Sequence, residues 1–168
     1  MNQRNMWLLL AGGLGLLLSQ TSGAVPISDA RARQLAPAVA EVLLQRASTT
    51  ALLQYCGQHY PRLHAAAGRA KTRWLQRNRQ VLQRADRLRE QLLRGIKREQ
   101  SRFAAELFAL DIDKAVQHSV QQFQHNLAGY PPPQQHRLCN HLILSVRAGD
   151  WDVARKQAKA FAIMENIH

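Results

Sequence analysis

Apolar residues recur at steps of three and four over residues 61–110, the spacing of an α helix that packs one face on a core. This apolar seam consists of Ala67, Ala70, Trp74, Val81, Ala85, Leu88, Leu92, Ile96, Phe103, Leu107 and Leu110. Pro61 suits the first turn, because its missing N–H would have no intrahelical partner there. Gly95 lies inside the pattern and costs about 1 kcal/mol relative to alanine, so a break near it is the alternative. The pattern predicts one long amphipathic helix over residues 61–110.

Two shorter helices are predicted before the long one. Ser28 or Asp29 can cap the first of them, because short polar side chains accept hydrogen bonds from the open N–H groups of a first turn. Pro37 either begins this helix or bends it. The three hydroxyl residues 48–50 would cap a second short helix that leads to Cys56.

Three further helical patterns follow the long one. The first covers residues 113–128 after a possible cap at Asp111 or Asp113, the second covers residues 134–147, and the third begins at Asp150. Three consecutive prolines separate the first two, since a run of prolines cannot continue a helix. No stretch has the alternation of a strand hairpin. We therefore predict an all-α fold, a single-domain irregular helical bundle of four to six helices over residues 25–168.

Residues 1–24 have the pattern of a signal peptide. Arg4 supplies a positive start, residues 6–18 are apolar, and residues 22–24 form a small-residue cleavage site. The apolar run is shorter than the ~20 residues that span a bilayer, which favours cleavage over an uncleaved membrane anchor. We therefore expect a mature chain of residues 25–168 that is periplasmic or secreted.

Cys56 and Cys139 are the two cysteines of the chain. Thiols in an oxidising compartment normally pair, so the sequence predicts a disulfide between them. The alternative is a zinc site, because Cys56 stands three residues before His59, and His136 three residues before Cys139. Seven histidines are spread along the chain, so a histidine near a cysteine arises readily by chance. We therefore favour the disulfide over the zinc site.

Basic residues crowd the same stretch as the apolar seam. The chain has a formal net charge of +12, and 18 of its 23 basic residues are arginine. Residues 69–102 hold ten Arg and two Lys against three Asp or Glu, too few for pairing within a helix to neutralise them. Seven arginines fall on one flank of the seam and form what we call the arginine column: Arg69, Arg73, Arg77, Arg84, Arg87, Arg94 and Arg98. On one continuous helix the column would extend over roughly 40 Å.

The arginine column predicts an anionic partner, because a guanidinium group binds phosphates and carboxylates through two parallel hydrogen bonds. We expect anionic lipid, lipopolysaccharide or an acidic protein. Aromatic residues do not interleave with the column, which disfavours single-stranded nucleic acid. A merely solvated face in an arginine-rich chain is the plain alternative. In a general way the chain is similar to small helical exported proteins of bacteria, including the basic periplasmic chaperones, although it lacks the LTxxQ repeats of one such family.

A second hypothesis gives the protein no ligand of its own. The apolar flank formed by Leu75, Leu82 and Leu93 would then pack on another copy of the chain or on a larger exported complex. In that case the protein is a structural or interaction subunit.

No stretch carries a recognisable catalytic motif such as a GxSxG elbow, an HExxH helix, a phosphate-binding glycine loop or an EF-hand loop. His118 and His125 share a helix face, but no acid or cysteine completes a triad or a ligand set there. We therefore expect no enzyme activity, no cofactor and no metal site. Trp74 and Asn78 lie one turn apart, and we expect them to be a core anchor and a hydrogen-bonding partner of a neighbouring segment.

Overall fold

The computed structural model describes residues 27–165, so the predicted signal peptide at residues 1–24 lies outside the described residues. Within that range the chain forms helices and no strand, which confirms the all-α prediction. The elements are α2 (Ile27–His59), η1 (Pro61–Leu63), α3 (His64–Arg77), α4 (Arg79–Glu99), α5 (Arg102–Ala128), α6 (Pro132–Ala148), α7 (Val153–Lys156) and α8 (Ala158–Glu165). These seven α helices exceed the expected four to six, because two of the predicted helices are divided.

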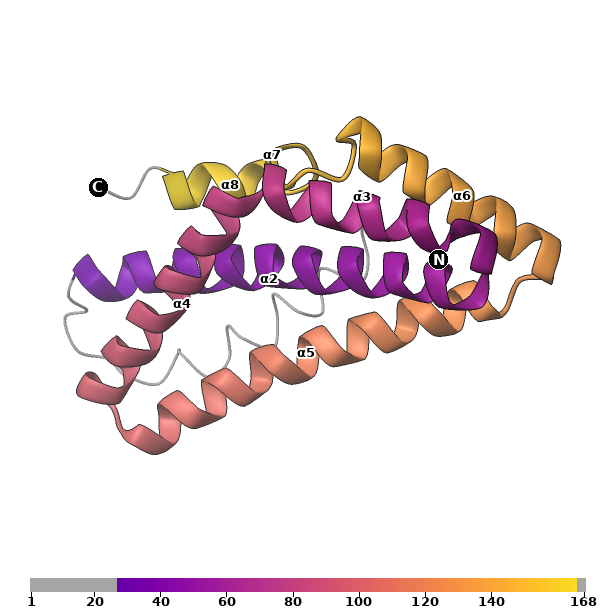
Figure 1. The fold of residues 1–168 in the computed structure, drawn as a ribbon. Helices are drawn as coiled ribbons and strands as arrows, with labels where there is room; N and C mark the ends of the chain where they lie inside the picture. The colour runs from indigo at the N-terminus through magenta and orange to yellow at the C-terminus, as the bar shows by residue number, and fades with distance from the viewer. Residues whose placement is uncertain (1–26, 166–168) are drawn as a thin grey trace.

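Helix α2 is the central element and, with 33 residues, the longest that the structure describes. It runs through the middle of the molecule and packs against α3, α4, α5 and α8 (Figure 1). The prediction of two short helices here is wrong, because α2 continues through Pro37 and through the hydroxyl residues. Thr50 does not cap a new helix; its hydroxyl donates to the carbonyl of Arg46 at 2.9 Å, one turn earlier in the same helix.

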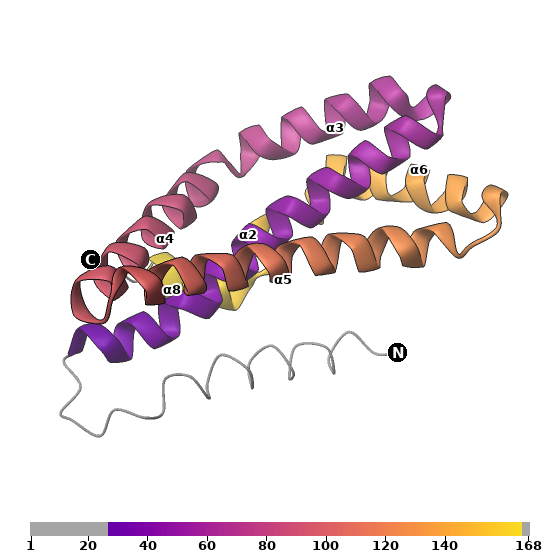
Figure 2. The ribbon, with the colours of Figure 1, turned by 90° about the horizontal axis from the view of Figure 1, so that it is seen from below.

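The prediction of one continuous helix over residues 61–110 is also wrong. It is interrupted at Asn78, between α3 and α4, and again before Ser101, whereas α4 continues through Gly95. The Ser101 hydroxyl caps α5 by accepting a hydrogen bond from the N–H of Ala104 at 3.0 Å. Helix α5 therefore starts ten residues before the expected cap at Asp111 and spans most of the length of the molecule (Figure 2).

The apolar seam is buried as predicted over its first part and exposed over its last part. Trp74 and Ala85 are fully buried with the seam positions around them, up to Leu92. Beyond the break at Ser101 the pattern fails, since Phe103 is 68% exposed and the next two seam leucines are exposed as well. Helix α5 packs inward with a different face, which includes Ile112.

Cys56 of α2 and Cys139 of α6 form the predicted disulfide, with both side chains fully buried. The bond closes a loop between residues 83 apart in sequence and ties α6 to the central helix. Both sulfurs are used in this bond, so neither can bind zinc as a thiolate in the alternative site. His59 stacks on Tyr55 instead, with ring centroids 3.9 Å apart.

No helix of the described range 27–165 is long and apolar enough to cross a membrane.

Candidate anion-binding surface

The end of α3 is fixed by three polar contacts with the segment before α7. Trp74, fully buried, donates through Nε1 to the carbonyl of Trp151 at 2.8 Å. Asn78 is 5% exposed, and its Oδ1 accepts from the N–H of Val153 at 2.9 Å while its Nδ2 donates to Asp152 at 3.1 Å. The expected core anchor and the expected hydrogen-bonding amide are both confirmed. They hold the position of α3, which carries the first part of the arginine column.

Arg77 of the arginine column belongs to this same junction. Its Nε lies 3.0 Å from Oδ2 of Asp152 and its Nη2 lies 3.0 Å from Oδ1, a two-pronged contact with one carboxylate. Nη2 also donates to the carbonyl of Val146 at the end of α6. Because Arg77 holds α3, α6 and the loop after α6 together, it has few N–H groups left for a ligand.

Three of the four column arginines on α4 also have acidic neighbours. Arg84 pairs with Glu165 of α8 at 3.7 Å, which joins α4 to the C-terminal helix. Arg94 lies 3.6 Å from Glu90, and Arg98 lies 3.8 Å from Glu99. These last two pairs are exposed and lie within one helix, where such contacts contribute little. Arg87 has no carboxylate partner in the described part of the chain.

The other two arginines of α3, Arg69 and Arg73, lack acidic partners. Arg69 and Arg73 are exposed, stand one turn apart and pair with no acid among residues 27–165. Three further basic residues around them are unpaired in the same range: Arg62, Lys71 and Arg79. The arginine column is interrupted by the break at Asn78; it is unpaired at Arg69 and Arg73 and largely paired from Arg77 onward. Its predicted length on one straight helix is not observed.

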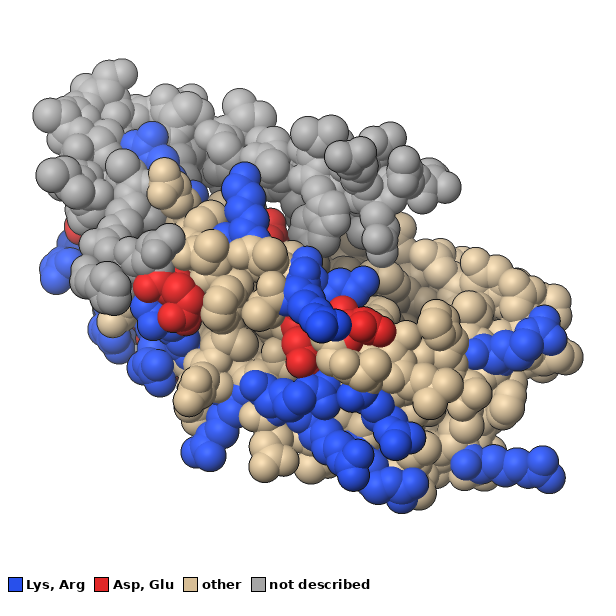
Figure 3. Space-filling view, turned by 90° about the horizontal axis from the view of Figure 1, so that it is seen from above, with Lys and Arg blue, Asp and Glu red and all other residues tan. Residues whose placement is uncertain are grey.

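Two long segments of the chain contain no Asp or Glu, residues 42–85 and residues 114–149. The disulfide and the packing of α3 on α6 bring the two segments together. We call the result the carboxylate-free end; it is the right-hand half of the molecule in Figure 1. On the face in Figure 3, Asp and Glu occur at the left and in the middle, whereas Lys and Arg gather along the edge formed by α3 and α4. The absence of Asp and Glu from these two segments is visible in the sequence itself.

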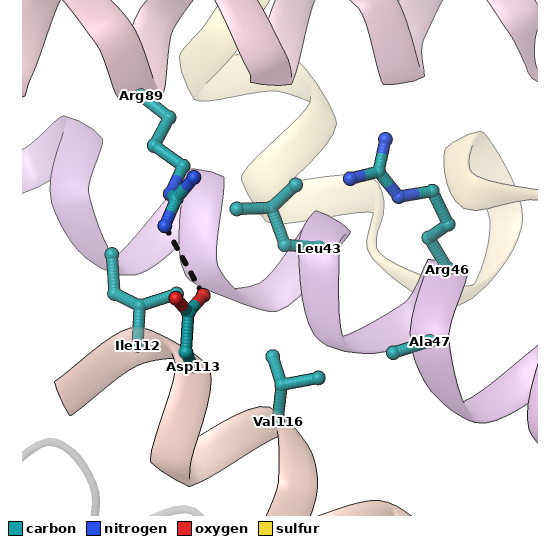
Figure 4. A pocket seen from close by; sticks show the side chains of 7 residues that line it. All are labelled: Leu43, Arg46, Ala47, Arg89, Ile112, Asp113 and Val116. Atoms are coloured by element: carbon teal, nitrogen blue, oxygen red, sulfur yellow. Dashed lines mark hydrogen bonds and ion pairs between the residues drawn. The ribbon is translucent and has the colours of Figure 1, made fainter. Parts of the chain in front are cut away.

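A small cavity of about 120 Å³ lies between α2, α4 and α5 (Figure 4). Two arginines border it: Arg46, which pairs with Asp86 at 2.8 Å, and Arg89, which pairs with Asp113 at 3.1 Å. Asp113 lines the cavity as well, and the remaining walls are apolar. Each guanidinium is matched by a carboxylate, so the cavity has no surplus positive charge with which to attract an anion.

The leucine flank proposed for a protein partner is not an open surface. Leu82 is 5% exposed and belongs to the core, Leu75 packs against that core, and Leu93 is half-buried. Only the half-buried Leu75 and Leu93 remain accessible on this flank, and the interaction-subunit hypothesis stays a prediction.

The described residues hold no group of three or more His, Cys, Asp or Glu side chains arranged to bind a metal ion. Comparison of the chain with known protein families, with curated proteins and with solved structures finds no match. The residues themselves therefore carry the functional argument.

Proposed function

We propose that this protein is a periplasmic or secreted binding protein, chaperone-like in character, that holds an anionic partner on its arginine-rich surface. The partner classes are anionic lipid, lipopolysaccharide and acidic protein. The role is binding without catalysis, and it requires no cofactor. Export agrees with the disulfide, since protein thiols normally stay reduced in the cytosol.

The observation that carries this proposal is the unpaired positive charge on α3. Arg69 and Arg73 present two exposed guanidinium groups about 6 Å apart along the helix axis, given about 1.5 Å per residue. Guanidinium groups at that spacing can bind neighbouring phosphates or carboxylates. Asp86, the nearest acid in sequence, pairs with Arg46, and Asp152, beside the end of α3, pairs with Arg77. We therefore assign the main contact to Arg69 and Arg73.

The test is titration of the protein with lipopolysaccharide at several salt concentrations. Binding should weaken steeply between about 50 and 200 mM salt, because each bound phosphate releases counterions. Replacing the two unpaired arginines of α3, Arg69→Gln with Arg73→Gln, should weaken binding and flatten the salt dependence. The matched control, Arg94→Gln with Arg98→Gln, removes the same charge from the paired part of the column and should have a smaller effect.

Two results would contradict the proposal. Absence of saturable binding to lipopolysaccharide, to anionic vesicles and to acidic protein would leave the arginines as a solvated face. Equal losses in the two double variants would mean that net charge alone governs the attraction, without a site on α3.

A further inference from the structure

Helix α6 has one face in the core and an opposite face in solvent. Cys139, Ile143 and Val146 are buried against α2 and α3. On the outside, Leu138 is 37% exposed and Leu144 is 52% exposed. The inner face already supplies the apolar contacts of this helix, so the core does not require the two outer leucines.

The charges on α6 are all of one sign. Arg137 and Arg147 are exposed and pair with no acid in the described range, and residues 114–149 contain none. The outer face of α6 is thus apolar and basic without a compensating carboxylate. Helices that lie on the surface of an anionic bilayer combine the same two properties.

The position of α6 is fixed from both ends. Gln135 in its first turn accepts from the hydroxyl of Tyr60 at 3.0 Å, and the disulfide at Cys139 anchors its middle. At its end Gly149 adopts a φ of 89°, which closes the helix in the left-handed region that glycine reaches without strain. The outer leucines and arginines are therefore held outward before any partner arrives.

We propose that the outer face of α6 docks on a surface of anionic lipid headgroups. Leu138 and Leu144 enter the headgroup region, about 9 Å apart along the helix axis, and Arg137 and Arg147 bind lipid phosphates. The inference rests on the proposed function and deepens it, since it names one partner class and adds a second contact surface beside α3.

Charge complementarity favours a lipid surface over a second copy of the chain. Two α6 faces brought together would place arginines against arginines with no carboxylate between them, which is repulsive. The comparable apolar stripe on α5, formed by Leu107 and Leu110 with Phe103, is bordered by Glu106, which pairs with Arg102 at 2.8 Å, and by Asp111. These acids offset the basic residues beside the stripe, so anionic lipid is attracted to it less than to α6, and the α5 stripe serves as a built-in control.

The experiment is co-sedimentation of the full protein with vesicles of phosphatidylcholine alone and of phosphatidylcholine with phosphatidylglycerol. The protein should bind only the anionic vesicles. Leu138→Ser with Leu144→Ser should reduce the bound fraction about fivefold, and Arg137→Gln with Arg147→Gln about tenfold. The matched control on α5, Leu107→Ser with Leu110→Ser, should bind like the unchanged protein.

Equal losses from the α5 and α6 leucine variants, or unchanged binding of both α6 variants, would overturn the inference. A dimer in sedimentation velocity that disappears with the α6 leucines would assign this face to a second copy instead. If vesicle binding depends on Arg69 and Arg73 but not on α6, the proposed function stands and this inference fails. Circular dichroism melting curves of all variants provide the check on folding.

Discussion

Arg77 and Asp152, 75 residues apart in sequence, meet through two guanidinium nitrogens and both carboxylate oxygens. This contact spans the break between α3 and α4 and the segment that leads into α7. Because of this contact, Arg77 is a structural residue of the fold and no longer a candidate for binding an anionic partner. The stability of the protein should report that difference directly.

We expect Arg77→Gln to lower the free energy of unfolding by about 1–2 kcal/mol, because the two-pronged ion pair and the bond to the Val146 carbonyl are both lost. Thermal unfolding measures the effect. Arg73→Gln, one turn earlier without an acid partner, is the matched control and should not destabilise the protein. Similar losses in the two variants would refute a special role for the Asp152 contact.

A larger loss is expected when Asn78 is changed to Ala. The substitution leaves the buried N–H of Val153 without its acceptor and removes the amide that donates to Asp152. A buried donor without a partner costs about 1–3 kcal/mol, and chemical denaturation should show a loss in that range. Asn140 is exposed on α6 and supplies the control, since Asn140→Ala should leave the denaturation midpoint unchanged.

Asn78 also shows which features of the fold the sequence alone does not predict. The spacing of apolar positions identified the buried face of α3 and α4 correctly, because that face depends only on helical geometry. The break at Asn78 had no local signal of the Gly or Pro kind, since its partners lie more than 70 residues away in sequence. Gly95 had such a signal and does not break α4. The helix-propensity cost of a residue such as Gly95 is therefore a weaker guide to where a helix ends than a hydrogen bond to a residue distant in sequence.

The candidate anion-binding surface, like the fold, could be predicted from the sequence only in part. A helical wheel placed the seven arginines on one flank, but it could not distinguish arginines that have a partner from those without one. Pairing depends on which acids the fold brings near, as with Glu165 of α8 beside Arg84 of α4. The gap in acids over residues 42–85 is visible in the sequence and includes Arg69 and Arg73, but Arg77 in the same gap pairs with the distant Asp152.

The disulfide should contribute strongly to stability. Closing a loop between residues 83 apart restricts the unfolded chain, which is worth roughly 4 kcal/mol on the loop-entropy estimate. Reductant should therefore lower the melting temperature of the protein. A variant with Cys56→Ser and Cys139→Ser should melt at the lower temperature and be insensitive to reductant. Alkylation of the unreduced, unfolded protein should find no free thiol, and detection of two would refute the bridge.

Glu41 on α2 gives the protein a pH-dependent stability term. Burial raises the pKa of its carboxyl above the ordinary 4.5, and the positive charge of Lys159 partly opposes this shift. The folded protein thus binds the proton more tightly than the unfolded chain, so this term costs stability as pH rises above about 4.5. Glu41→Gln should melt higher than the unchanged protein at pH ~7, with the difference shrinking towards pH ~4. Lys159→Met should widen that difference, and a constant difference at all pH values would contradict the assignment.

The unpaired arginines of α3 should also affect stability, with a sign opposite to that of Arg77. Arg69 and Arg73 stand four residues apart on one helix, where like charges repel by about 0.2–0.5 kcal/mol. Arg69→Gln with Arg73→Gln should therefore raise the melting temperature slightly at low salt. The gain should fade at high salt, because screening already weakens the repulsion in the unchanged protein.

This small gain bears on function because it separates two reasons for an exposed arginine. Replacing an arginine that supports the fold lowers the stability of the protein. Replacing an arginine that serves a ligand can instead raise the stability of the protein while weakening its binding. The α3 double variant should show the second combination: a slightly higher melting temperature and weaker lipopolysaccharide binding. A lower melting temperature with unchanged binding would assign Arg69 and Arg73 to the fold, and the anion-binding proposal would then lack its central contact.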